Sequence, residues 1–80
     1  MATVRFFAAA KEAARCGEKT VPATDLVGLK QQLEKSFGDG FSRVLQQSSW
    51  LVDGVRVPMG DNRPIGDDTV VDVLPPFAGG

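Results

Sequence analysis

The C-terminal segment carries the residues whose types and order most clearly suggest chemistry. The 80-residue sequence ends in Pro75-Pro76-Phe77-Ala78-Gly79-Gly80, directly after a run of strand-forming residues over 70–74. Prolines fix φ and favour an extended chain, and glycines without a Cβ atom fit a narrow channel in which a side chain would clash. We therefore expect a thin, extended arm with a carboxylate at its tip, on Gly80.

A carboxylate in this position is useful chemically only after activation. Its negative charge repels nucleophiles, and oxide is a very poor leaving group. Adenylation by ATP replaces that oxygen with a good leaving group, so the Gly80 carbonyl could then transfer to a nucleophile. No other residue of the chain suggests a general base, and we expect no catalytic group beyond the tail.

The composition excludes several other kinds of site. The net charge is −1 with no segment dense in Lys and Arg, which argues against a nucleic-acid or anionic membrane surface. The chain has no histidine and one cysteine, Cys16, so it cannot by itself build a typical zinc site, a histidine-dependent triad or an internal disulfide. The sequence suggests neither a signal peptide nor a membrane span, and we expect a cytoplasmic protein.

The acidic residues of the last third of the chain are of the type that binds metal ions, but their spacing does not indicate a metal site. Their spacing is not that of an EF-hand, and it fits turns and a solvated strand face better. We therefore expect no metal site. The residues concerned are Asp61, Asp67, Asp68 and Asp72.

Residue patterns predict a series of short elements that would position the tail. β-Branched and aromatic residues indicate a strand over 3–7, and an alanine-rich segment over 8–15 predicts a short helix that ends near Gly17. A brief strand follows over 19–21. The main helix should begin after Thr24-Asp25 and end at Gly38, with Gly28 weakening it by about 1 kcal/mol relative to alanine.

The second half of the chain predicts a hairpin and a final strand. Residues 41–45 suggest one further helical turn, and Asp53-Gly54 between apolar runs predicts a hairpin over 50–57 with a type I′ turn. A loop over 60–68 leads to a strand over 69–74. The expected fold is α+β, a mixed sheet with one main helix on one face plus short helices. If the first and last strands are parallel neighbours, the tail leaves from a central strand.

Several segments together resemble one known family, the ThiS/MoaD ubiquitin-like β-grasp sulfur carriers. The residues that carry the resemblance are 4–8, Leu29–Leu33, Val52-Asp53-Gly54, Pro64–Asp68 and Val73–Gly80. Pro75-Pro76 before Gly79-Gly80 resembles the MoaD branch, the small subunit of molybdopterin synthase, more than the thiamine-type carriers. The link over 58–62 is longer than is usual in the family. The resemblance implies a β-grasp domain over 1–74 and a functional tail over 75–80.

The resemblance also implies partners and a reaction. A MoeB-like (E1-like) enzyme would adenylate Gly80 with ATP and Mg, and a persulfide donor would supply sulfur to give a thiocarboxylate. A MoaE-like large subunit would receive the tail (Pro75, Pro76, Phe77, Ala78 and Gly79) in its active site, where sulfur passes to a cyclic pyranopterin to form molybdopterin. This chain would be a non-catalytic subunit and co-substrate that binds no cofactor itself.

The partner surface is expected beside the base of the tail. By resemblance, Phe7 and Leu74 match exposed apolar contact positions, and Val57 is a third candidate; since strands alternate faces, ordinary core packing is equally compatible with the sequence. A strand added at the sheet edge is another possible docking mode. Three other functions remain open: a carrier for thiamine, cysteine or another metabolite, a modifier joined to lysines through Gly80, or a plain binding module.

Overall fold

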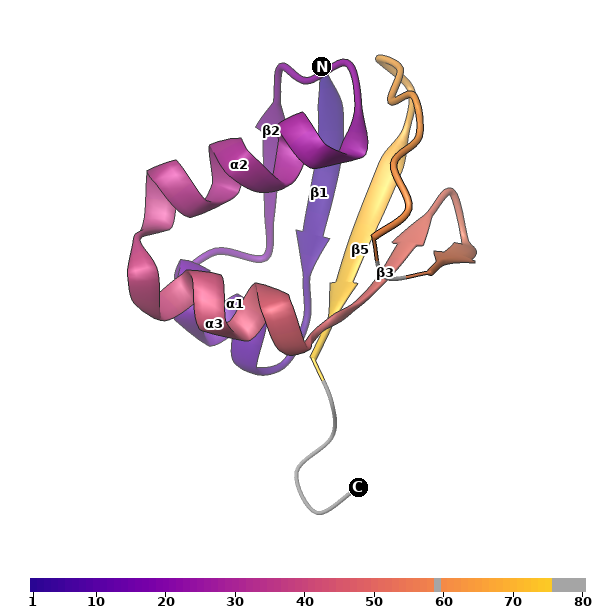
Figure 1. The fold of residues 1–80 in the computed structure, drawn as a ribbon. Helices are drawn as coiled ribbons and strands as arrows, with labels where there is room; N and C mark the ends of the chain where they lie inside the picture. The colour runs from indigo at the N-terminus through magenta and orange to yellow at the C-terminus, as the bar shows by residue number, and fades with distance from the viewer. Residues whose placement is uncertain (59, 76–80) are drawn as a thin grey trace.

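The computed structural model describes residues 1–58 and 60–75 (Figure 1). Three helices and five strands follow one another along these residues. Their bounds are β1 Ala2–Phe6, α1 Ala9–Ala14, β2 Glu18–Val21, α2 Leu26–Phe37, α3 Asp39–Gln47, β3 Ser49–Val52, β4 Val55–Val57 and β5 Val70–Leu74. The described elements confirm the α+β class.

The strands form one mixed sheet in the order β2-β1-β5-β3-β4. β1 and β5 are parallel, with Thr3 beside Val70 and Phe6 beside Val73, and the other neighbouring strands are antiparallel. Figure 1 shows the β1 and β5 arrows pointing the same way, with α2 and α3 across one face. The condition that the sequence analysis left open is therefore met: the last strand lies beside the first, and it is central and paired on both sides.

The main helix begins and ends where the sequence predicted. The Asp25 side chain accepts a hydrogen bond of 2.7 Å from Gly28 N, and Gly38 ends the helix at a φ of 87°. A Cβ atom at Gly28 would lie 2.8 Å from Asp25 Oδ1. Gly28 therefore does more than weaken the helix, because it leaves room for the N-cap.

The helix α3 is longer than the single turn that the sequence suggested. It spans nine residues, and Phe41 and Leu45 on it are buried. Phe41 packs edge-on against Phe6 of β1 with ring centroids 5.5 Å apart, and Phe37 packs edge-on against Phe6 at 5.9 Å. This aromatic contact with the sheet stabilises a segment whose Asp39-Gly40 start is a weak helix former.

The short helix α1 follows a strained turn. Ala10 N donates a 3.1 Å hydrogen bond to Phe7 O, and Ala8 between them has φ 52° and ψ −126°, a region that glycine usually occupies in type II′ turns. At its other end the left-handed residue is Arg15, with φ 60°. The helix therefore ends with its cap at Arg15, two residues before the glycine near which the sequence predicted its end.

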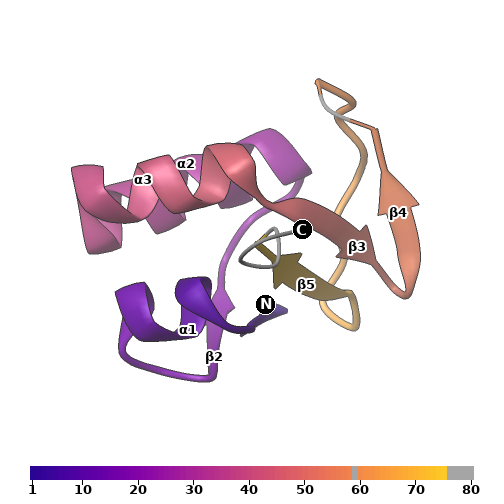
Figure 2. The same cartoon turned by 90° about the horizontal axis from the view of Figure 1, so that it is seen from below.

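The remaining elements lie where the sequence placed them. Asp53 and Gly54 have φ of 49° and 83°, as a type I′ hairpin requires. Figure 2 shows this hairpin, with β4 at the side of the molecule away from α1 and β2. No helix of the described part of the chain is long and apolar enough to cross a membrane.

Candidate functional site

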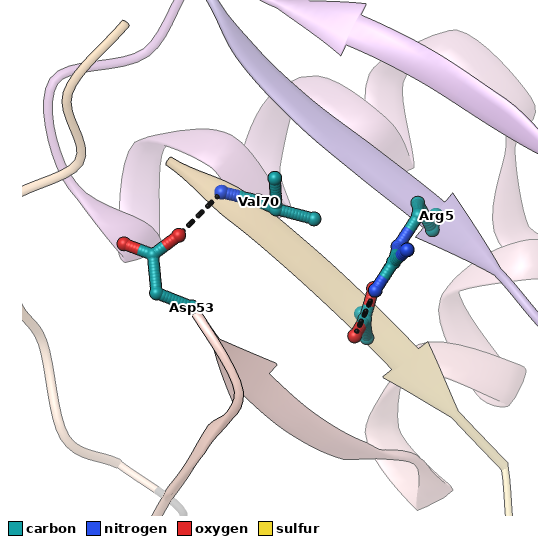
Figure 3. Close-up of polar contacts among 4 residues, drawn as sticks. Arg5, Asp53 and Val70 are labelled. Carbon is teal, nitrogen blue, oxygen red and sulfur yellow. Dashed lines mark hydrogen bonds and ion pairs between the residues drawn. The ribbon is translucent and has the colours of Figure 1, made fainter. Parts of the chain in front are cut away.

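The strand that leads into the tail is held from its first residue to its last. At its start, Asp53 N donates a 2.8 Å hydrogen bond to Val70 O, and the Asp53 side chain accepts one of 2.9 Å from Val70 N (Figure 3). At its end, Leu74 pairs with Ser49 of β3. Pro75, directly after the strand, is buried. The base of the tail is therefore a fixed point of the domain.

Of the predicted tail over 75–80, only Pro75 is described by the structure. The predicted reactive group, Gly80, and the predicted channel residues Pro76, Phe77, Ala78 and Gly79 lie outside the described residues. The structure therefore bears on the base of the tail and on the surface around it.

An ion pair joins the two parallel strands on the sheet face opposite the helices. Arg5 Nε and Nη2 donate hydrogen bonds of 2.6 and 2.8 Å to the two carboxylate oxygens of Asp72 (Figure 3). The hydrogen bond and the charge of Asp72 raise the pKa of Arg5 above its ordinary value. Two parallel bonds of this kind fix the geometry of both side chains, so β5 is tied to β1 by side chains as well as by backbone.

Asp72 corrects the expectation of a solvated acidic residue. Asp72 is 7% exposed, because Arg5 covers it. The alternation of side chains along a strand places Arg5 and Asp72 on the same face of the sheet once β1 and β5 are known to be parallel neighbours. The sequence therefore predicts this pair only when the strand order is already known. Sequence reasoning therefore missed both members of this pair.

Two of the three predicted contact residues lie together at the base of the tail. Phe7 N donates a 3.3 Å hydrogen bond to Val73 O, and continuing the register of β1 and β5 by one residue places Phe7 beside Leu74. Phe7 is 40% exposed and Leu74 is partly buried. The Arg5 guanidinium carbon lies 5.9 Å from the centre of the Phe7 ring, within the range of a cation–π contact.

The third candidate, Val57, lies elsewhere. It is 6% exposed and belongs to the hydrophobic core, on the pair position opposite Trp50. Of the two alternatives that the sequence left open for Val57, the free chain therefore adopts core packing. The apolar patch beside the tail, called here the Phe7–Leu74 patch, consists of those two residues.

Two solved structures share this architecture over almost the whole chain. One is a chain of the protein–protein complex of subunits 1 and 2 of molybdopterin-converting factor from Helicobacter pylori 26695, with a TM-score of 0.74 and 24% identity, covering 99% of this chain and 97% of that one. The other is SAMP1 from Haloferax volcanii, with a TM-score of 0.82 and 18% identity, covering 99% and 98%. No family model and no curated protein matches the sequence. The likeness establishes the ubiquitin-like β-grasp fold that the resemblance implied.

Proposed function

We propose that this chain is a sulfur carrier of the MoaD type, which works through its C-terminal tail. The observation that carries the proposal is the position of the tail base, at the end of a central strand and beside the Phe7–Leu74 patch. A β-grasp chain of molybdopterin-converting factor covers 99% of this chain, which supports the same assignment.

The proposed reaction takes place at the Gly80 carbonyl carbon. A carboxylate oxygen attacks the α-phosphate of ATP, and pyrophosphate leaves. The terminal sulfur of a donor persulfide then attacks the acyl-adenylate and displaces AMP. Cleavage of the resulting sulfur–sulfur bond by a thiol leaves the thiocarboxylate on Gly80 and a disulfide on the donor side. ATP and Mg belong to the activating enzyme, and no cofactor is assigned to this chain.

Two protein partners follow from this reaction. An E1-like, MoeB-type enzyme would activate the tail, and a MoaE-like large subunit would accept it and pass sulfur to a cyclic pyranopterin. The Phe7–Leu74 patch is proposed to contact these partners. Exposed apolar side chains next to a functional segment are typical of binding surfaces, and a partner that covered Phe7 would gain apolar burial at about 25 cal/mol per Å².

The test is the intact mass of the protein after incubation with a MoeB-type enzyme, ATP and a sulfur source. We expect a mass increase equal to the exchange of one oxygen for sulfur, absent from a variant that lacks Gly80. Failure to form adenylate or thiocarboxylate, with an enzyme proven active on another carrier, would refute the proposal. Transfer from the modified protein to a pyranopterin with a MoaE-like subunit separates molybdopterin synthesis from other sulfur pathways, and Gly80-dependent adducts on lysines would reveal a modifier.

A further inference from the structure

The exposed ring of the Phe7–Leu74 patch lies beside an arginine of the same strand. Phe7 follows β1 directly and is 40% exposed, and Arg5 comes two residues earlier, so both side chains lie on the same face of the sheet. The Arg5 guanidinium carbon lies 5.9 Å from the centre of the Phe7 ring. Because two χ1 rotamers are common in extended segments, this contact can select the direction in which the ring points.

Arg5 can select a rotamer of Phe7 only if its guanidinium is itself held. A free arginine side chain samples many rotamers, but Arg5 donates hydrogen bonds of 2.6 and 2.8 Å to the two carboxylate oxygens of Asp72 (Figure 3). Two parallel bonds of this kind fix the plane of the guanidinium as well as its position. The cation beside the Phe7 ring is therefore held in one orientation.

The carboxylate that holds Arg5 is buried, whereas the group that it holds is not. The side chain of Asp72 is 10% exposed and that of Arg5 is 50% exposed. Asp72 lies on the central strand β5, between Arg5 of β1 and Leu51 of β3. The ion pair therefore connects an exposed ring, through Arg5, to the most firmly paired strand of the sheet.

We propose that Arg5 is a positioning residue of the partner surface: held by Asp72, it keeps the Phe7 ring in the orientation in which the activating enzyme binds it. This inference rests on the proposed function, since that function assigns a partner to the Phe7–Leu74 patch. A side chain that already has its bound orientation loses less conformational entropy when the partner covers it. The simpler alternative is that the ion pair only ties β1 to β5, and the two readings predict different results.

The test replaces both members of the pair, Arg5→Gln together with Asp72→Asn. Removal of Arg5 alone would leave a buried carboxylate without its counter-ion, and such a loss destabilises a fold strongly. Two amide side chains can still bond to each other, but the cation beside Phe7 is gone. If the double variant fails to fold, Asp72→Asn alone serves instead, because water can solvate the half-exposed Arg5 that it releases.

The first measurement is the χ1 rotamer of Phe7 in the free protein, from three-bond NMR couplings. We expect one rotamer in the wild type, with nuclear Overhauser contacts between Arg5 Hε and the Phe7 ring, and a mixture of rotamers in the double variant. Arg56→Gln is the matched control. It removes an exposed guanidinium from the same row of this face, opposite Leu51, and should leave the Phe7 couplings unchanged.

The second measurement is pyrophosphate release from ATP by a MoeB-type enzyme at varied concentrations of the full chain. The double variant should raise KM for the chain about fivefold, within the range expected for ordering one side chain at an interface. Its kcat should be unchanged, because the pair affects binding and not the chemistry at Gly80. In a Phe7→Leu background the same two replacements should change KM by less than about twofold, since Arg5 then has no ring to position.

Three results would overturn the proposal: one unchanged Phe7 rotamer in the double variant, an unchanged KM despite mixed rotamers, or an equal rise in KM with and without the Phe7 ring. The last would mean that Arg5 contacts the partner directly. If the enzyme released no pyrophosphate even with the wild type, the proposed function would fail, whereas the NMR couplings would still decide whether Arg5 positions Phe7.

Discussion

Replacement of Ala8 by glycine should stabilise this protein, against the usual effect of that substitution. Ala8 has φ 52° and ψ −126° within the turn closed by Ala10 N and Phe7 O. A non-glycine residue in such a sparsely populated region costs about 1–3 kcal/mol. Glycine relieves that strain but adds unfolded-state entropy worth about 0.4–1 kcal/mol. The Ala8 side chain is exposed, so its removal leaves no cavity.

The expected net effect of Ala8→Gly is a gain of about 1 kcal/mol in the free energy of unfolding, or about 4–8 °C in Tm for a domain of this size. Urea and thermal unfolding measure it. Ala13→Gly is the matched control, because Ala13 is exposed on α1 and glycine within a helix costs about 1 kcal/mol. Equal losses in both variants would refute the argument. A D-alanine at position 8, made by semisynthesis, should stabilise without the entropy term.

Three further predictions concern other parts of the molecule. Gly28→Ala should leave stability almost unchanged in urea unfolding, since the gain of about 1 kcal/mol in helix propensity is offset by disturbing the Asp25 cap; a full gain would contradict the cap argument. Phe7→Asp should weaken binding to a MoaE-like subunit in calorimetry with the fold intact, whereas Val57→Asp should lower the free energy of unfolding by at least about 2 kcal/mol. Burial lowers the pKa of Lys30 in the folded chain, so the charged form of Lys30 destabilises the fold at pH values below that folded-state pKa. As the pH rises from the folded-state pKa of Lys30 to its unfolded-state pKa, the free energy of unfolding of the wild type should therefore increase relative to that of Lys30→Met. A difference between the two proteins that does not change with pH would refute this.

The sequence predicted those elements whose local signals agree with their packing. The Asp25 cap and Gly38 define the ends of α2 almost to the residue, and Asp53-Gly54 defines the hairpin, because turn and cap chemistry acts over a few residues. The length of α3 was missed, since it depends on Phe41 packing against a strand distant in sequence.

The polar features of the site were harder to predict than the elements. The bond between Arg5 and Asp72 spans 67 positions of the chain and exists only because the parallel pairing sets the register. Val57 faces the core because of the pleat of a three-residue edge strand, which one sequence alone does not determine. Such features depend on register, and register is a property of the whole sheet.

The separation between core and tail makes the proposed chemistry testable without a stability artefact. The buried side chains of the described residues all lie between Ala2 and Pro75, and β5 keeps its neighbour β3 up to Leu74. Deleting Gly80 removes none of these contacts, so the Tm should stay within about 1–2 °C of wild type, the shift of a surface change below 0.5 kcal/mol. If the deletion lowered Tm by more, the tail would contribute to the fold, and lost sulfur transfer would no longer isolate the role of the carboxylate.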